Sequence, residues 1–368
     1  MNRIIDFLKK EIVLSVSFVL ALISMFFVPP SEKYFDYIDF RTLGLLFSLM
    51  TIMAGLNKMG IFRLLAKNLL NKAKTMRGVT LLLVLLCFFS SMLITNDVAL
   101  ITFVPFSVVL LKLANKQNRM IFVVTLETIA ANLGSMLTPI GNPQNLYLFS
   151  AYNMSISDFF YTIAPCAMLS LGLLVIFSLF SDKSELANLG DREEVIFDKR
   201  LLTMYAVLFA IALLSVFRVL NYIVLLAVVI VFVLIFDRKV LLKVDYSLLF
   251  TFVFLFIFIG NLGNIAQINS WLSEIVGGNE VVVGVLASQV FSNVPAAILL
   301  SGFTCNATAL MIGVNIGGLG TLIASMASLI SFKFIQKESA SIAKYLGVFT
   351  LLNVVFLAAN LALWVVVK

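Results

Sequence analysis

The chain of 368 residues contains no histidine, three cysteines and seven prolines, and only 12% of its residues are charged. The absence of histidine removes the commonest general base and metal ligand, which argues against an intramembrane metalloprotease or a haem-binding bundle. Cys87, Cys166 and Cys305 stand singly in apolar segments, so their spacing indicates neither a metal site nor a disulfide framework. We therefore expect no cofactor.

Apolar residues, in contrast, make up 61% of the chain, and its mean hydropathy is +1.08. A soluble globular protein has roughly 45–50% apolar and about 25% charged residues, so the solvent of this chain must be lipid. Because backbone groups find no water partners in lipid, we expect an all-α polytopic membrane protein. Nothing in the sequence indicates nucleic-acid binding.

The basic residues predict a topology, because cytoplasmic loops retain Lys and Arg. Loops rich in basic residues, which we place inside together with the N-terminus, lie at 58–77, 112–119, 183–200, 238–243 and 333–344. Loops without Lys or Arg, which we place outside, lie at 150–158, 264–280 and 304–308. Two apolar stretches begin and end on one side and are predicted to be re-entrant hairpins, 78–111 and 281–303. The pattern predicts about nine crossings, two hairpins and an outside C-terminus.

The chain also contains two copies of one pattern. Residues that recur at matching spacing are Ser91, Thr95, Asn96 and Ala99 with Ser288, Ser292, Asn293 and Ala296, and Asn132, Gly134, Gly141, Asn142 and Asn145 with Asn315, Gly317, Ala324, Ser325 and Ser328. Asp39-Phe40 and Asp245-Tyr246 each open a long apolar helix. Since one hairpin enters from inside and the other from outside, these are inverted repeats. We predict repeat 1 over 1–181, a cytoplasmic linker and connecting helix over 182–218, and repeat 2 over 219–368.

Each repeat is interrupted twice at membrane depth. The hairpins contain Thr95-Asn96-Asp97 and Ser292-Asn293-Val294, and the spans 120–149 and 309–332 are predicted to be broken helices. Non-helical backbone at this depth is tolerated only where it is buried or lines a wet cavity. The exposed helix ends offer carbonyls to a cation and N–H groups to an anion. Inverted repeats with broken helices are typical of secondary transporters, whose site lies where the repeats meet.

On these motifs the chain resembles the ion transporter superfamily, which includes divalent anion/Na⁺ symporters, citrate carriers and arsenite permeases. The paired hairpin motifs and the break Gly141-Asn142-Pro143-Gln144-Asn145 carry the resemblance. By resemblance, Na⁺ would be bound in two sites, one formed by Ser91, Thr95, Asn96 and the Gly141 carbonyl and the other by Ser288, Ser292, Asn293 and the Ala324 carbonyl. Substrate would lie between Asn96, Asp97, Asn142, Asn293, Val294 and Ser325. The resemblance also implies a homodimer.

Two acidic residues are candidates for proton coupling. Asp97 and Val294 stand where dicarboxylate carriers have threonine, and a carboxylate there repels a dianion unless it is protonated or paired with a cation. Intramembrane acids are functional by default, and Asn-Asp at the tip looks more like the arsenite permease branch. Glu127 lies in the middle of 120–137 and is either a proton site or an interhelical hydrogen-bonding group.

The sequence therefore predicts a multi-pass transporter of the plasma or inner membrane that moves a small anion or oxyanion, coupled to Na⁺ or H⁺, by alternating access. The alternatives within this class are a Na⁺/H⁺-type cation antiporter and an arsenite-like efflux permease for a neutral oxyacid. A channel is disfavoured, because two opposed hairpins that meet midway predict an occluded site. An enzyme is not expected, since no nucleophile or oxyanion arrangement is visible, and the chain has no nucleotide-binding GxxxxGK[ST] pattern for ATP-driven transport.

Overall fold

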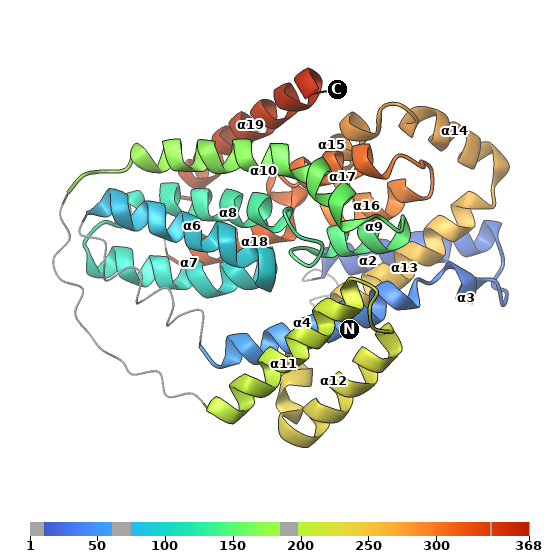
Figure 1. Ribbon diagram of the computed structural model, residues 1–368. Coiled ribbons are helices and arrows are strands. Elements are labelled where there is room, and N and C mark those ends of the chain that lie inside the picture. Colours follow the sequence, from blue (N-terminus) through green and yellow to red (C-terminus); the bar gives the residue numbers. More distant parts are fainter. Residues whose placement is uncertain (1–10, 61–74, 185–197, 339–340, 368) are drawn as a thin grey trace, which may run out of the picture.

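The computed structural model describes residues 11–60, 75–184, 198–338 and 341–367, which form helices and no strand. The helices fall into two groups that each pack together (Figure 1). In the first group, α2 lies along α13, and α4 lies along α11 and α12. Its members are α2 (Ile12–Phe27), α3 (Tyr34–Tyr37), α4 (Phe40–Lys58), α11 (Lys199–Val216), α12 (Tyr222–Phe236), the 3₁₀ helix η2 (Arg238–Lys243) and α13 (Tyr246–Gly263).

The second group contains both predicted hairpins and both predicted broken helices. Its first half consists of α6 (Met76–Ile94), α7 (Asn96–Leu113), η1 (Gln117–Arg119), α8 (Met120–Ser135), α9 (Pro143–Ala151) and α10 (Ile156–Leu179). Its second half consists of α14 (Ala266–Val276), α15 (Glu280–Phe291), α16 (Asn293–Ser301), α17 (Ala307–Ile316), η3 (Leu322–Ala324), α18 (Met326–Lys337) and α19 (Ile342–Val367). α8 lies centrally in this group and contacts α6, α7, α10, α18 and α19.

The helix starts follow from local side-chain chemistry. Asp39 and Asp245, matched in the two copies of the pattern, cap α4 and α13 by accepting from the backbone N–H groups of Thr42 and Leu248, both at 3.0 Å. Asn142 caps α9 in the same way, and Pro143 occupies the first position of that helix, where its missing N–H costs nothing. Both predicted breaks are therefore helix ends, but only the first has a side-chain cap, since Ser325 precedes α18 without one.

The described residues include seven helices that are long and apolar enough to cross a membrane, and α14 with α15 forms a further pair bent by 110°. This architecture is that of a polytopic membrane protein. α6 and α7 are each long enough to cross by themselves, whereas α15 and α16 have only 12 and 9 residues. The crossing number, the sidedness and the inverted repeats stay predictions.

The stretch 264–280, expected to be a loop, contains the helix α14. Its apolar residues Ile268, Leu272, Ile275 and Val276 recur at helical spacing. The absence of Lys and Arg was used to predict on which side of the membrane this stretch lies, and it does not indicate whether the stretch is a loop or a helix.

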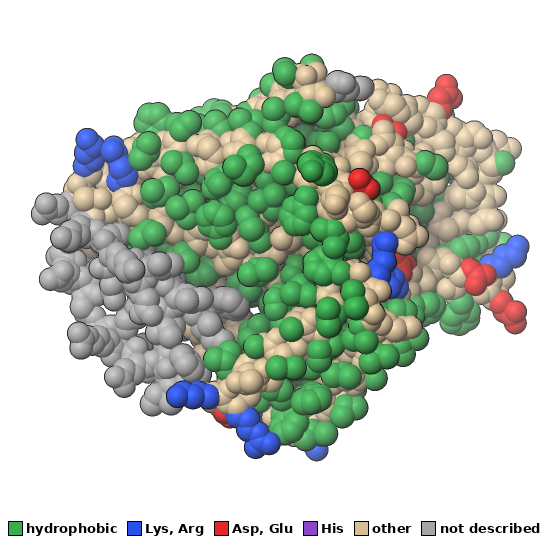
Figure 2. Space-filling model, viewed as in Figure 1, with side chains coloured by type: hydrophobic (Ala, Val, Ile, Leu, Met, Phe, Trp, Pro, Cys, Tyr) green, Lys and Arg blue, Asp and Glu red, His purple; other side chains and the backbone are tan. Residues whose placement is uncertain are grey.

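Three ion pairs join segments that the basic-residue pattern assigns to one side. They are Lys58–Asp237 at 2.8 Å, Lys116–Asp182 at 3.4 Å, and Lys112–Glu338. Basic residues at 3, 9, 10, 63, 67, 72, 74 and 192, on which part of the topology rests, lie outside the described residues. In Figure 2 hydrophobic side chains are spread over the middle of the visible face, and most of the coloured charged groups lie toward its edges.

Candidate functional site

The two hairpin tips share one unusual backbone conformation. Thr95 has φ 70° and ψ 153°, and Ser292 has φ 74° and ψ 154°. This region is sparsely populated by residues other than glycine and is strained for a β-branched side chain. Each residue stands between two antiparallel legs, α6 and α7 or α15 and α16, so that the second leg starts directly at the tip. The positions matched in the sequence are therefore matched in geometry.

The first tip is bonded to the first helix break. The backbone N–H of Asn96 donates to the carbonyl of Gly141 at 3.2 Å, and the Asn96 side-chain oxygen accepts from the N–H of Asp97 at 3.0 Å. The structure thus brings together Thr95, Asn96 and Gly141, which are three of the four residues predicted for the first cation site.

Asn132 of α8 connects this tip to the second helix break. Its Oδ1 accepts from Nδ2 of Asn96 at 3.2 Å and from Oγ of Ser325 at 2.9 Å. All three side chains are almost completely buried. One amide oxygen therefore holds together the first hairpin and the residue that precedes α18.

Asn315 of α17 makes a similar connection toward the first break. Its Oδ1 accepts from Nδ2 of Asn142 at 3.2 Å, and its own Nδ2 donates to Oδ1 of Asn145 at 2.7 Å. Asn142 also donates to Oγ of Ser135 at 3.1 Å. Asn132 and Asn315 occupy matched positions of the two copies, which is the signal that would have identified them as members of the site.

The predicted cation-site serines lie against glycines of the broken helices. A Cβ on Gly134 would stand 2.7 Å from Oγ of Ser91, and a Cβ on Gly317 would stand 2.7 Å from Oγ of Ser288. In the structure the two hydroxyls donate to helix carbonyls, Ser91 to Phe88 at 2.9 Å and Ser288 to Gly284 at 2.7 Å. Both serines are fully buried, so the two copies share this packing.

The second tip lies against the second break. A Cβ on Gly318 would stand 2.8 Å from Nδ2 of Asn293, and η3, which ends at Ala324, packs on α15. Gln289 was not predicted, yet it fastens this break, because its Nε2 donates to the carbonyls of Gly317 and Leu319 at 2.8 and 2.9 Å. Val294 is buried directly after the tip.

We expect Gly134→Ala to loosen the hairpin. The added Cβ would stand 2.2 Å from the carbonyl oxygen of Phe88, and overpacking of this kind costs about 1–3 kcal/mol. The matched control is Gly172→Ala on α10, where a Cβ meets nothing within 4 Å and helix propensity favours alanine. The apparent melting temperature of the purified protein should fall for Gly134→Ala and hold or rise for Gly172→Ala. Equal melting temperatures would contradict the close approach of α8 to α6.

A cavity of about 560 Å³ lies between the first tip, the first break and the first helix group. Its polar lining comprises Asn57, Lys58, Thr95, Asp97, Thr102, Asn142, Lys243 and Asp245. Lys243 and Asp245 are exposed while Asn142 is buried, so the cavity runs from solvent to the site. Of the six residues predicted to bind substrate, Asp97 and Asn142 line it. Asn96, Asn293, Val294 and Ser325 do not line it. Asn96 is bonded to the lining residue Asp97, and both Asn96 and Ser325 are bonded to Asn132.

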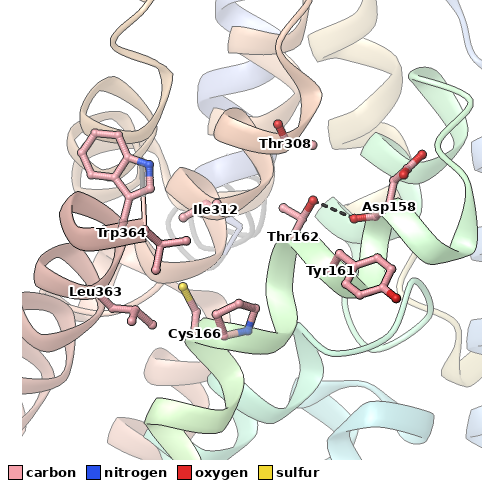
Figure 3. Close-up of a pocket in the computed structure, with 10 residues that line it drawn as sticks. Asp158, Tyr161, Thr162, Cys166, Thr308, Ile312, Leu363 and Trp364 are labelled. Carbon is pink, nitrogen blue, oxygen red and sulfur yellow. Dashed lines mark hydrogen bonds between the residues drawn. The ribbon is translucent and has the colours of Figure 1, made fainter.

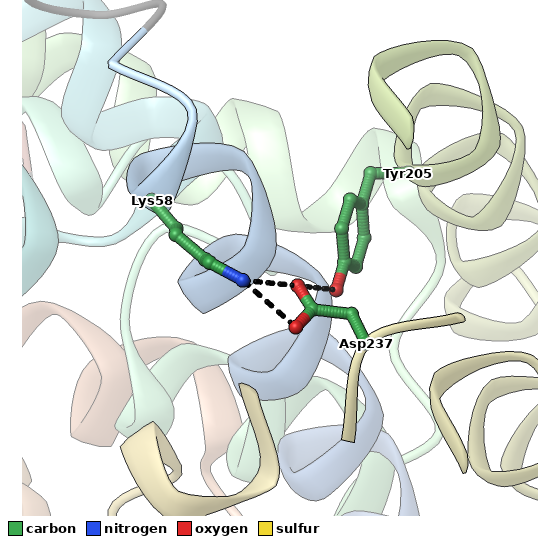
Figure 4. Close-up of polar contacts among 3 residues, drawn as sticks. All are labelled: Lys58, Tyr205 and Asp237. Atoms are coloured by element: carbon green, nitrogen blue, oxygen red, sulfur yellow. Dashed lines mark hydrogen bonds and ion pairs between the residues drawn. The ribbon is translucent and has the colours of Figure 1, made fainter. Parts of the chain in front are cut away.

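Two groups in this lining carry unusual chemistry. Oδ1 of Asp97 is buried and has no hydrogen-bond partner among the described residues. Lys58 donates to both oxygens of Asp237 at 2.8 and 2.9 Å, and Tyr205 donates to the same carboxylate at 3.1 Å (Figure 4). The lining thus contains a carboxylate oxygen of Asp97 without a hydrogen-bond partner and a lysine, Lys58, that is ion-paired with Asp237. Neither Lys58 nor Lys243, the other lysine of the lining, was predicted as a site residue.

A second cavity of about 390 Å³ lies away from the tips, between α10, α17 and α19. Asp158, Tyr161 and Thr162 of α10 line one side, and Leu363 and Trp364 of α19 line another (Figure 3). It contains none of the residues predicted from the repeats.

Known proteins are similar to this chain over most of its length. The sequence profile of the citrate transporter family, CitMHS, matches residues 4–309. An uncharacterized transporter from Methanocaldococcus jannaschii is 32% identical over 350 residues, which cover 94% of this chain and 95% of that protein. The inner membrane protein YbiR from Escherichia coli is 32% identical, covering 84% and 83% of the two chains.

A silicon efflux transporter from Oryza sativa is 31% identical over 160 residues, which are 43% of this chain and 32% of that protein. The profile match extends through both tips and the first break, and the transporter from Methanocaldococcus jannaschii aligns over nearly its whole length. The chain is therefore a multi-pass membrane transporter and belongs to the citrate transporter family.

Proposed function

We propose that this protein is a secondary active transporter that moves a small anion or oxyanion, coupled to Na⁺ or H⁺. The observation that supports this most is the cavity of about 560 Å³, which runs from exposed Lys243 to the tip residue Asp97 and the break residue Asn142. Lys243 offers an incoming anion a positive charge at the exposed end, where Asp245 also lines the cavity. The deeper end offers amide and hydroxyl groups, the partners that an oxyanion requires once it leaves water.

The coupling mechanism rests on the two tips. Cation binding at Thr95 and Asn96, and at Ser292 and Asn293, would neutralise helix-end carbonyls and order both tips. Because Asn132 bonds the first tip to Ser325, order at one tip is transmitted to the opposite break. Alternating access then presents the loaded site to each side of the membrane. We place the protein in the plasma or inner membrane as a homodimer.

A second candidate cargo is a neutral oxyacid, exported in exchange for a cation or proton. Asp97 favours it, because an unengaged carboxylate oxygen accepts hydrogen bonds from hydroxyl groups and repels an anion. The similarity of part of this chain to a silicon efflux transporter also favours this cargo. Cation exchange alone, through Asp97, is the third possibility within the transporter class.

A ligand screen on the purified protein tests the proposal. Melting temperatures would be measured with and without Na⁺, at pH 5.5 and 8, with citrate, succinate, sulfate, phosphate, arsenite and silicic acid. A ligand at 100 times its dissociation constant stabilises by about 2.7 kcal/mol. We expect Na⁺- or pH-dependent stabilisation by at least one anion. Stabilisation by arsenite or silicic acid alone would indicate a neutral oxyacid as the cargo. Stabilisation by Na⁺ or protons alone would indicate a cation antiporter.

A further inference from the structure

Glu127 lies near the middle of α8 and is 0% exposed. Its Oε1 accepts a hydrogen bond from Oγ of Ser107 at 2.5 Å and a weak one from Sγ of Cys87 at 3.9 Å. Its Oε2 is buried without a hydrogen-bond partner among the described residues. Glu127 does not line the cargo cavity. A carboxyl group therefore sits in the second helix group, away from the cavity, with half of its hydrogen-bonding capacity unused.

No cation of the described residues balances Glu127. The helices packed on α8 are α6, α7, η1, α10, α17, α18 and α19, and α17 has no titratable residue. Their titratable or charged groups are Arg77 and Cys87 on α6, Asp97 and Lys112 on α7, Arg119 on η1, Asp158, Tyr161 and Cys166 on α10, Lys333 and Lys337 on α18, and Lys344 and Tyr345 on α19. Arg77 is in the first turn of α6, ten residues before Cys87, and Arg119 directly precedes α8, about two turns from Glu127, so neither pairs with that carboxyl group. Lys112 is paired with Glu338, and Lys333, Lys337 and Lys344 are exposed. Burying a carboxylate without a cation has a large desolvation free energy. Protonation of the carboxylate removes this penalty and requires no additional side chain or ion in the packed interior.

Glu127 contacts both legs of the first hairpin. Cys87 belongs to α6 and Ser107 to α7, so both legs of the first hairpin contact the same carboxyl group. As a carboxylate Glu127 only accepts hydrogen bonds, whereas as an acid it also donates one. Its protonation state therefore changes how both legs are held on α8. Asn132, which bonds the tip through Asn96, lies about 1.4 turns further along the same helix.

We propose that Glu127 is a reversible proton-binding site, separate from the cargo cavity, that couples transport to pH through the packing of α6 and α7 on α8. This rests on the proposed function and identifies H⁺ as a coupling ion. In the step itself, a proton from water forms an O–H bond with one carboxylate oxygen, and the reverse step returns it. The group that carries the proton is thus distinct from Asp97, which faces the cargo.

Infrared difference spectroscopy on the lipid-reconstituted protein tests the site without any cargo. Between pH 5 and pH 9 we expect a C=O band of a protonated carboxyl group that titrates in the wild type, is lost in Glu127→Gln and persists in Asp97→Asn. Ser107→Ala should keep the band and shift its pH midpoint, because it removes the 2.5 Å hydrogen bond. A band unchanged in Glu127→Gln, or one from Glu127 that does not titrate, would overturn the proposal.

Transport in proteoliposomes separates this inference from the proposed function. With arsenite and citrate as probes, Glu127→Gln should retain exchange of internal for external probe but lose its response to a pH gradient. Glutamine preserves the size of the side chain and a hydrogen bond to Ser107, so a purely structural role predicts wild-type pH dependence in this variant. That result would refute the inference and leave the function intact. If the wild type moves neither probe under any gradient, the proposed function fails, while the spectroscopic test still decides the proton site.

Discussion

Replacing Asn132 with alanine should reduce transport to below about one tenth of the wild-type rate while the protein remains folded in the membrane. The substitution removes the acceptor shared by Asn96 and Ser325. Each buried donor left without a partner costs about 1–3 kcal/mol, and both costs fall on the arrangement that joins the first tip to the second break. Asn96→Ala should have the same effect, because it removes the other end of the bond. Uptake by proteoliposomes containing each variant measures the loss.

Asn360→Ala is the matched control for this prediction. Asn360 is also an asparagine buried within a helix of the second group, and its Nδ2 donates to Oγ of Ser170 at 3.1 Å and to the carbonyl of Phe356 at 2.9 Å. Its removal should lower the melting temperature by a similar amount and leave transport close to that of the wild type. If Asn360→Ala abolished transport as completely as Asn132→Ala, general destabilisation would explain both results and the role of the central bond would be lost.

Asp97→Asn should weaken cargo or coupling-ion binding by about 10- to 100-fold. The variant keeps the shape of the side chain but removes its charge, and a hydrogen bond to a charged group contributes about 1.5–3 kcal/mol. Asp97 lines the cavity together with Asn142, and its buried Oδ1 has no hydrogen-bond partner among the described residues, so the loss should appear in the concentration for half-maximal transport. The pH dependence should persist, because we assign the proton to Glu127.

Asp245→Asn supplies the comparison, since it removes an equal charge from the lining of the same cavity. Asp245 is exposed, and its Oδ1 already caps α13, a role that asparagine fills equally well. We expect less than about a threefold change in half-maximal concentration, because exposed charges are screened. Equal effects of the two variants would show that only the net charge of the cavity matters and that Asp97 makes no specific contact.

The tips and breaks could be predicted because their polar residues and prolines stand out from the apolar sequence on either side. Thr95, Asn96 and Asp97 are polar within a long apolar stretch, and Pro139 and Pro143 interrupt an otherwise helical span. These features follow from local chemistry, so the structure shows hairpin turns and helix ends at the same residues. Thr95 and Ser292, matched by spacing in the two copies, also share one backbone conformation in the structure.

The partners of these residues could not be predicted in the same way. A single asparagine within an apolar helix, such as Asn132, fits many interhelical contacts, and only the packing of α8 against the second break selects Ser325. Lys58 and Lys243 were used only to predict the topology. Their neighbours in the sequence do not indicate that α4 and the start of α13 lie beside the first tip. Residues far apart in sequence build this cavity, so it arises from tertiary structure alone.

In the proposed mechanism, cargo is carried uphill through the cavity that lies between the first tip and the first break. The most direct test is accumulation of labelled citrate, phosphate or arsenite by proteoliposomes under an imposed Na⁺ or H⁺ gradient, measured for the wild type and for Asn96→Ala. We expect saturable, gradient-dependent accumulation above the external concentration for at least one of these probes, and its loss in the variant. Non-saturable flux that only equilibrates the probe, or accumulation that is unchanged in Asn96→Ala, would contradict this mechanism.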